Sequence, residues 1–314
     1  MTYYIGIDVS KKVLNIFDGE KDLIFDNKEN LCSLKKYLKK RYPDLSSLVI
    51  LFEATGIYSY YLKAFCADNH IKACIINPQA SHNFAKSLGT RSKTDTRDAR
   101  TIWAYHKLIS DQDIRIPQVD PVLITLASYL TSYRLALKQR LSLTNHLEGV
   151  KDKVLHRLLK KEQERLCQLE QELLIRMDTY INKYPELNED YRRLLAISGV
   201  GRKTAISLLV LFHTYPDTNR KQITALIGLD PVQRQSGTSV HGKSRISKHG
   251  NQMMRKCLYM PTLVSIQYNQ KIKVFYDRLV SKHKPKKVAV IACMRKLLLI
   301  AHAIYKNKTV YVPG

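Results

Sequence analysis

The chain has 314 residues, a hydrophobic content of 45% and a formal net charge of +25 at pH 7. This length is sufficient for two domains with their own cores, and this charge predicts a polyanionic partner. Six cysteines are scattered without a CxxC pair, which argues against a zinc site and against a disulfide framework. No uninterrupted apolar run reaches transmembrane length, and the chain enters a strand at once, so we expect neither a membrane segment nor a signal peptide.

The positive charge is concentrated in the last two-fifths of the chain. Residues 191–314 contain 23 Lys and Arg against three acidic residues, a net charge of +20, which leaves +5 for residues 1–190. We therefore expect the C-terminal part to contribute a major part of the contact with nucleic acid.

Residues 1 to about 112 predict an α/β domain in which strands come first and helices later. Apolar runs predict strands at residues 3–8, 13–17, 22–27, 48–52 and 71–76. Helical spacing predicts helices near residues 28–41, 58–68 and 79–87, and another from residue 95 onward. This order of elements is typical of an RNase-H-like sheet.

Acidic residues stand where two of these strands end and where one helix begins. Asp8 ends the first strand, and Glu53 follows the continuous apolar run of residues 48–52. Asp95 and Asp98 are three residues apart, so they share one face of a helix capped by Thr94. Acids at a helix N-terminus are also favoured by the helix dipole, which is the structural alternative for this pair.

If these four carboxylates meet, they require a cation. Two carboxylates 4 Å apart repel by about 4 kcal/mol at an effective dielectric constant near 20. Oxygen ligands without paired His or Cys favour Mg²⁺ or Mn²⁺. Two such ions can clamp the attacking and leaving oxygens of a phosphodiester, so the pattern predicts metal-assisted chemistry on nucleic acid.

Residues 122–184 contain no proline and one glycine, and two leucine stripes run through them at helical spacing. Pro117 and Pro121 mark the boundary before them, and Pro185 the boundary after them. Long helices packed as a hairpin or coiled coil are expected here. The segment could serve within one chain or as a dimerisation arm, and we favour contact between subunits.

Two basic segments follow. Residues 194–205 predict a helix, a turn and a second helix, in which Gly199, Gly201, Arg202 and Lys203 are expected to contact phosphate. Residues 235–250 predict a polar, glycine-rich loop rich in cations. This loop either contacts DNA or presents a nucleophilic serine.

A serine nucleophile needs cations to hold the transition-state phosphate. The candidate cations are Lys243, Lys248, Arg245 and Arg255. His241 could accept the serine proton, although contact with phosphate is the simpler role. Composition does not choose among Ser236, Ser239, Ser244 and Ser247.

Several blocks of this sequence resemble the IS110 family of insertion-sequence transposases, which includes the Piv-type DNA invertases. The N-terminal blocks resemble the family's RuvC-like domain and lie at residues 6–11, 52–58, 77–78 and 84–99. The C-terminal block lies at residues 231–250, and the resemblance covers essentially the whole chain. The family's acidic tetrad falls on Asp8, Glu53, Asp95 and Asp98, and its catalytic serine, in a Ser-Gly pair, falls on Ser236.

The resemblance implies a RuvC-like metal-dependent domain at residues 1–115, a long-helix oligomerisation segment at 116–185 and a basic, mainly α-helical transposase domain at 186–314. It implies a DNA recombinase in which Mg²⁺ or Mn²⁺ on the tetrad and the serine form one composite site, either within one subunit or between two. The serine would form a covalent phosphoserine link to DNA. A dimeric or tetrameric assembly and a structured guide RNA are further implied partners, and we expect a cytoplasmic, nucleoid-associated bacterial protein.

Two other functions remain open at this point. A RuvC-like structure-specific endonuclease would use the tetrad alone, without a covalent step. A non-catalytic nucleic-acid-binding protein would need neither the tetrad nor the serine. A sugar-kinase-like ATPase also begins with a strand and an aspartate, but no glycine-rich phosphate loop follows Asp8 here.

Overall fold

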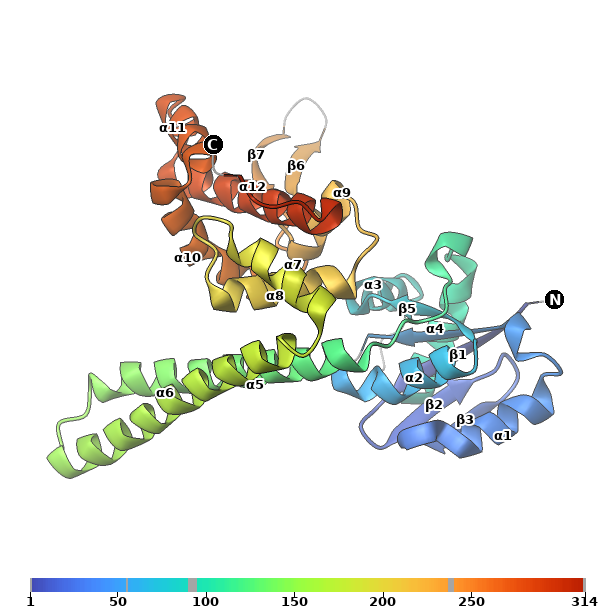
Figure 1. Ribbon diagram of the computed structural model, residues 1–314. Coiled ribbons are helices and arrows are strands. Elements are labelled where there is room, and N and C mark those ends of the chain that lie inside the picture. The colour runs from blue at the N-terminus through green and yellow to red at the C-terminus, as the bar shows by residue number, and fades with distance from the viewer. Residues whose placement is uncertain (1, 55, 90–94, 237–239, 313–314) are drawn as a thin grey trace. The chain divides into compact units, whose positions relative to one another are not determined.

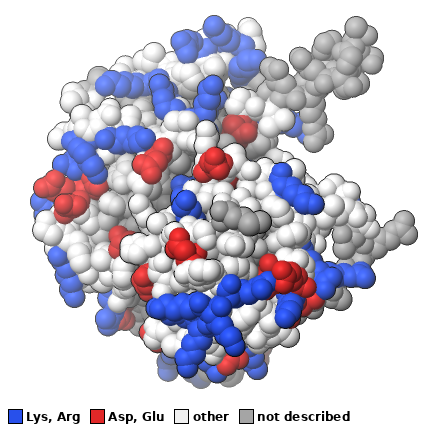
Figure 2. All heavy atoms as spheres, turned by 90° about the vertical axis from the view of Figure 1, so that its right-hand side faces the viewer, with Lys and Arg blue, Asp and Glu red and all other residues white. Residues whose placement is uncertain are grey.

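The computed structural model describes residues 2–54, 56–89, 95–236 and 240–312, with the backbone alone at residues 57, 95–96, 233–236 and 240–244. The chain forms two compact units, Met1–Asp120 and Pro121–Gly314, and each is described here by itself (Figure 1). The face drawn in Figure 2 carries many Lys and Arg, with acidic side chains among them.

The N-terminal unit is built on a five-stranded sheet in the order β3-β2-β1-β4-β5. Neighbouring strands β1, β2 and β3 are antiparallel, whereas β4 is parallel to both β1 and β5. The strands are β1 (Tyr3–Val9), β2 (Val13–Phe17), β3 (Asp22–Asp26), β4 (Leu48–Glu53) and β5 (Lys72–Ile76). The helices are α1 (Cys32–Arg41), α2 (Tyr60–Asp68), α3 (Pro78–Ser87) and α4 (Asp95–Ala104), with short 3-10 turns at Glu29–Leu31, Leu45–Ser47, Gly56–Ser59, Tyr105–Lys107 and Asp111–Asp113. The α/β character expected of this region is confirmed.

Each face of the sheet has its own core. Alternate residues of a strand point to opposite faces, so Ile5 and Ile7 of β1 lie on the face covered by α1 and α2. On the opposite face, Val49 and Leu51 of β4 pack with Ile102 of α4. Because both faces are covered, β4 is apolar along nearly its whole length.

Helix α4 lies directly on the backbone of β1. A Cβ atom added at Gly6 would stand only 2.4 Å from the carbonyl oxygen of Ala99 and 2.4 Å from the amide nitrogen of Trp103. Tyr4 precedes Gly6 by two residues in β1, and its carbonyl accepts a hydrogen bond of 3.0 Å from the Trp103 Nε1. The missing side chain of Gly6 is therefore what allows the helix to approach the strand this closely.

The C-terminal unit is mainly helical. Its elements are α5 (Pro121–Leu147), α6 (Lys153–Ile181), α7 (Pro185–Leu195), α8 (Arg202–Thr214), α9 (Arg220–Ile227), β6 (Pro231–Ser236), β7 (Val240–Ile246), α10 (Gln252–Tyr268), α11 (Gln270–Ser281) and α12 (Lys286–Asn307). One apolar cluster joins most of these helices. By length and composition alone α12 could cross a membrane, but 56% of its apolar stretch is buried inside the protein, as in a core helix.

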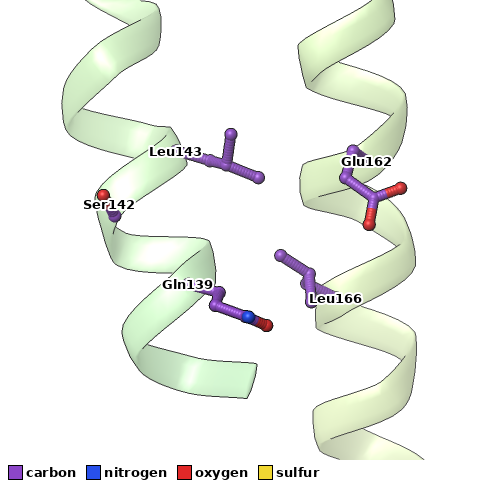
Figure 3. A pocket seen from close by; sticks show the side chains of 5 residues that line it. All are labelled: Gln139, Ser142, Leu143, Glu162 and Leu166. Carbon is purple, nitrogen blue, oxygen red and sulfur yellow. The ribbon is translucent and has the colours of Figure 1, made fainter. Parts of the chain in front are cut away.

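Helices α5 and α6 form a long hairpin, visible in green in Figure 1. Arg140 and the buried Glu170 join them through an Nε–Oε1 contact of 2.5 Å. A groove of about 360 Å³ lies between the helices, and Leu143 and Leu166 point toward each other across it (Figure 3). Its lining consists of Gln139, Ser142, Leu143, Glu162 and Leu166.

A β-hairpin stands where a polar loop was expected. Strands β6 and β7 pair antiparallel between residues 231 and 246, with an irregular register between Val232 and Arg234. The interpretation of residues 235–250 as a loop was therefore wrong for residues 235–236 and 240–246, which belong to strands. The strands were missed because β6 contains only one apolar residue besides proline, so its sequence lacks the alternation of a half-buried strand.

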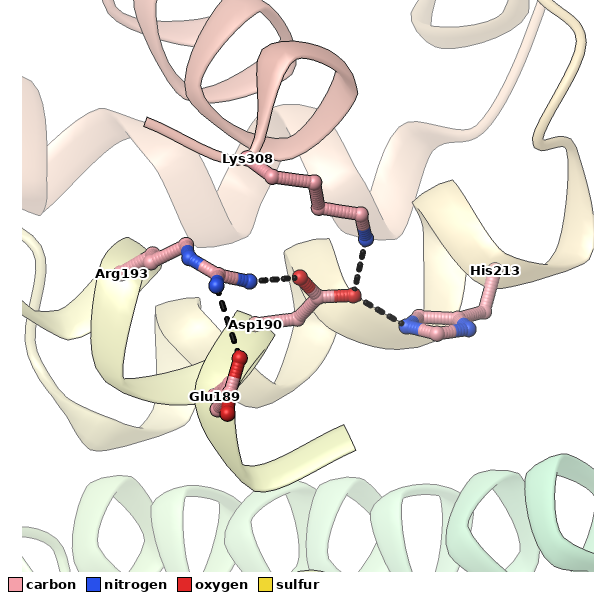
Figure 4. Close-up of polar contacts among 5 residues, drawn as sticks. All are labelled: Glu189, Asp190, Arg193, His213 and Lys308. Atoms are coloured by element: carbon pink, nitrogen blue, oxygen red, sulfur yellow. Dashed lines mark hydrogen bonds and ion pairs between the residues drawn. The ribbon is translucent and has the colours of Figure 1, made fainter. Parts of the chain in front are cut away.

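A buried carboxylate joins three helices of the C-terminal unit. Asp190 of α7 is 2% exposed and accepts a hydrogen bond of 2.8 Å from Arg193 Nη1 (Figure 4). Its other oxygen lies 2.6 Å from Lys308 Nζ and 3.1 Å from His213 Nε2, so residues after α12 and on α8 converge on α7. The negative charge is buried only because these groups surround it.

Replacing Gly6 with Ala should destabilise the N-terminal unit by about 2 kcal/mol, since the new methyl group meets backbone atoms that cannot rotate away. Urea unfolding would measure the loss. The matched change Gly149→Ala, whose new Cβ has its nearest neighbour at 3.7 Å, should alter stability by less than about 1 kcal/mol.

Replacing Asp190 with Asn should lower the free energy of unfolding by about 3 kcal/mol, because Arg193, His213 and Lys308 lose their shared anion. Thermal and urea unfolding would report it. Glu189→Gln removes only the exposed partner of Arg193 and should change stability by less than about 1 kcal/mol. Equal effects of the two changes would contradict the central role of Asp190.

Candidate active site

Asp8 and Glu53 stand side by side at one edge of the sheet. Strands β1 and β4 are parallel, and Ile7 pairs with Phe52, so the next residue on each strand is one of the two acids. Both share the face of Gly6 and Leu51, which is the face that α4 covers. Both side chains are half-buried. The expectation that these strand ends meet thus has a geometric basis in the strand register.

Helix α4 brings the second pair of acids toward the same edge. Along β1, Tyr4 contacts Trp103 and Gly6 contacts Ala99. The helix therefore runs antiparallel to β1. The next residue of β1 on this face is Asp8, and it lies toward the first turn of α4. The half-buried Asp98 immediately precedes Ala99. The Asp95 position is one turn before Ala99, with its side chain outside the described atoms, and Thr94, the expected cap, lies outside the described residues.

A buried amide connects the loops that follow the two acid-bearing strands. The Asn27 Nδ2 donates 2.8 Å to the Ser10 carbonyl after β1 and 2.9 Å to the Tyr58 carbonyl after β4. Asn27 itself is 7% exposed. Because both strand ends share this one donor, the loops beside Asp8 and Glu53 are held together.

The donor set at this edge is made of carboxylate oxygens, which suits a hard divalent cation such as Mg²⁺ or Mn²⁺. Within the part of the chain whose side chains are described, no three His, Cys, Asp or Glu side chains approach one another closely enough to hold one ion. The side chain of Asp95, one of the four candidate ligands, is not among those described. The chemistry and the shared edge fit the expected metal, and the ligand roles remain proposals.

The candidate nucleophile lies in the other unit, on the β-hairpin. Ser236 is the last residue of β6 and pairs with Val240 at the far end of the hairpin; its backbone alone is described. At the near end, the Ser247 Oγ donates 2.5 Å to Asp230 Oδ1, and the Ser247 amide donates 2.9 Å to the Asp230 carbonyl. The hydroxyl of Ser247 is thus already occupied by a carboxylate.

The expected cations near the serine have different environments. Arg245 and Lys248 are exposed, on β7 and just after it. Arg255 is half-buried, and its Nη1 donates 2.7 Å to the Ile227 carbonyl, so this group supports the turn between α9 and the hairpin. Lys243 belongs to β7, and its side chain, like those of His241 and Ser244, is not among those described; Ser239 lies outside the described residues altogether.

The turn between α7 and α8 is shaped by α10. Gly199 has φ +94°, and an added Cβ would stand 2.1 Å from the Ser265 Oγ of α10. Gly201, in contrast, has open space where a Cβ atom would stand. It is the N-cap residue of α8 and makes no side-chain cap hydrogen bond. Arg202 is ion-paired with Asp178, whereas the Lys203 Nζ lies 5.1 Å from the centre of the Tyr133 ring.

One cation near this turn was missed by the sequence interpretation. Arg134 of α5 is half-buried and donates 3.2 Å to Ser207 Oγ, and no acidic side chain forms an ion pair with it among the described residues. Burial lowers the pKa of its guanidinium. The signal was present in the sequence as an arginine within the apolar stripe of α5, one residue after Tyr133.

Comparison with known proteins agrees with this architecture. Residues 5–156 match a transposase family model for the DEDD domain of IS110, and residues 191–277 match the Transposase IS116/IS110/IS902 family. Pilin gene-inverting proteins of Moraxella lacunata and Moraxella bovis are each 30% identical over 97% of this chain and 96% of theirs. A protein of insertion element IS110 from Streptomyces coelicolor is 24% identical over 43% of this chain and 33% of its own length.

The two matched regions each contain candidate site residues, one set in each unit. The first contains the acid-bearing sheet edge and α4, and the second contains the α7–α8 turn and the β-hairpin. The full-length similarity to the gene-inverting proteins connects both parts in one chain. This protein therefore belongs to the IS110 family of transposases and DNA invertases.

Proposed function

We propose that this protein is a site-specific DNA recombinase, a transposase or invertase, which joins strands through a covalent phosphoserine intermediate. The observation that carries the proposal is the register that sets Asp8 beside Glu53 under the first turns of α4, where Asp98 lies. The names of the similar gene-inverting proteins support DNA as the substrate.

The acidic edge would hold Mg²⁺ or Mn²⁺ through Asp8, Glu53, Asp95 and Asp98. When bound, such ions supply positive charge to the phosphodiester and stabilise the departing oxygen. The protein's own contribution is placement, since the strand register and the α4–β1 contact fix three of these positions without any ligand.

Ser236 supplies the nucleophile in this proposal. Its Oγ forms a bond to phosphorus and gives up its proton, while the bond from phosphorus to one deoxyribose oxygen breaks and that oxygen takes up a proton. The link conserves the energy of the broken phosphodiester, so the reverse attack by a second strand rejoins the DNA. Lys243, Arg245 and Lys248 on the same hairpin would stabilise the charge on the phosphate.

The C-terminal unit would provide the main contact with nucleic acid, including Gly199, Gly201, Arg202, Lys203 and Arg255 around its turns. Four lysines at the junction of α11 and α12 are all exposed: Lys282 and Lys284 between the two helices, and Lys286 and Lys287 in the first turn of α12. None of these four forms an ion pair with an acid among the described residues. A structured guide RNA would be bound by the same chemistry, because phosphate contacts do not depend on base sequence.

We further propose a homo-oligomer built on the α5–α6 hairpin. Leu135, Leu158 and Ile175 are each more than half exposed along it. A second copy is the occupant that would cover these side chains, and it would allow the acidic edge and the serine of one composite site to come from different subunits.

Replacing Ser236 with Ala should abolish covalent attachment to a labelled duplex from the protein's own genetic locus, measured by denaturing gel in the presence of Mg²⁺ or Mn²⁺. Asp8→Asn and Glu53→Gln should each reduce strand cleavage by at least about 100-fold. Ser128→Ala is the matched control, because that exposed hydroxyl donates to the Ile124 carbonyl of its own helix, α5.

Cleavage that persists in Ser236→Ala without a covalent adduct would identify a simple endonuclease. Binding and biological activity that survive Asp8→Asn would instead identify a non-catalytic nucleic-acid-binding protein. Either result would overturn the proposed recombinase.

The logarithm of DNA affinity should fall linearly with the logarithm of salt concentration, with a slope of about −0.9 per phosphate contacted. Replacing Lys284 and Lys287 together with Ala should make this slope less steep by about 2. Fluorescence anisotropy at several salt concentrations would measure it. Lys28→Ala, whose amine is ion-paired with Asp26 in the N-terminal unit, should leave the slope unchanged.

A further inference from the structure

A buried amide in β2 lacks a hydrogen-bond partner. Asn15 is 7% exposed, and its Nδ2 is paired with no acceptor among the described residues. The residues on either side, Leu14 and Ile16, are apolar and fully buried on the opposite face. An apolar side chain at position 15 would fit this environment better, because an unpaired buried donor lowers stability.

The location of Asn15 indicates what it serves. Strands β1 and β2 are antiparallel, and Asn15 pairs directly with Asp8. Side chains of such a pair project from the same face with Cβ atoms about 5 Å apart. Asn15 therefore lies next to Asp8, the carboxylate of the proposed metal site that belongs to the central strand β1.

Helix α4 encloses this position. Two residues further along the same face of β2, the Phe17 ring lies 5.0 Å from the Arg100 guanidinium and 5.3 Å from the Trp103 ring. Asn15 precedes Phe17, so it lies toward the first turn of α4, on the side from which Asp98 approaches. The amide is thus enclosed among β1, β2 and α4 beside the acidic edge.

We propose that Asn15 is a positioning residue for Asp8: its Nδ2 donates a hydrogen bond to the Asp8 carboxylate when that carboxylate binds a divalent cation. Metal-ligating carboxylates are commonly held by such outer hydrogen bonds, and their loss typically costs about 10-fold or more in metal affinity. The inference rests on the proposed metal-dependent function, but it concerns a residue outside the tetrad.

The proposal predicts opposite effects on stability and on metal binding. Asn15→Leu should raise the melting temperature of the metal-free protein, because it removes an unpaired buried donor, while weakening Mn²⁺ binding about 10-fold in isothermal titration calorimetry. Asn15→Asp should lower the metal-free melting temperature through repulsion with Asp8 and enlarge the rise produced by Mn²⁺.

A purely structural role would give a different result. Phe17→Leu, on the same face of β2 but in contact with Trp103, should lower the melting temperature and leave the Mn²⁺ affinity unchanged. If Asn15→Leu binds Mn²⁺ within about twofold of the wild type, the role of Asn15 is refuted. If Asn15→Leu fails to fold, an Asn15→Asp protein whose Mn²⁺-induced shift equals that of the wild type refutes it equally.

The same titrations separate this inference from the proposed function. Wild-type protein that binds no Mn²⁺, or an Asp8→Asn variant that binds it as well as the wild type, would overturn the metal site itself. Wild-type binding that is lost in Asp8→Asn, together with normal binding in Asn15→Leu, would overturn only the role of Asn15.

Discussion

The contact of α4 with the bare backbone of β1 at Gly6 is the constraint on which the acidic edge depends. A helix normally packs on a sheet through side chains of both elements, which keep the two backbones apart. Here the helix backbone lies against the strand backbone, and the Trp103 indole fixes it lengthwise through the Tyr4 carbonyl. The first turn of α4 therefore meets the sheet edge at a defined place, and its position follows from packing rather than from any ligand.

The two units divide the requirements of DNA chemistry between them. The N-terminal unit holds Asp8 and Glu53 at neighbouring positions of its sheet, and Asn27 joins the loops beside them. The C-terminal unit carries most of the excess positive charge, and some of its acids are bound within the unit, as Asp230 is by Ser247. A polyanion is attracted by the second unit, whereas the acidic edge of the first unit would repel it without divalent cations.

The strand positions were predictable because burial on both faces leaves a clear mark. The apolar run before Glu53 identified β4 and its end, and Pro78 correctly marked the start of α3. The predicted single helix from residue 28 was wrong at its beginning, since Asn30 and Leu31 have φ of 66° and 41° and α1 begins only at Cys32. Neither residue is glycine, so nothing local in the sequence indicates this left-handed bend.

Features that depend on tertiary partners were not predictable from local patterns. The role of Gly6 becomes visible only when α4 is placed on it, because a glycine within an apolar strand can equally mark a bulge or a sharp bend. Arg255 was predicted from the sequence as a phosphate ligand, and the additional contacts of its guanidinium with backbone carbonyls, one of them in a turn 28 residues earlier in the chain, were not. The sequence indicates that Asp8 and Glu53 stand at strand ends, but it does not give the register that sets the two residues side by side.

The β-hairpin has a consequence for how the proposed nucleophile, Ser236, is presented. A two-stranded hairpin is only marginally stable by itself, so its conformation depends on where it is anchored. Its anchor, the Asp230–Ser247 clamp, lies at the end opposite Ser236. The hairpin is therefore held at one end, and Ser236 stands at the other end. Small changes in angle at the clamp would be amplified into larger movements at the serine.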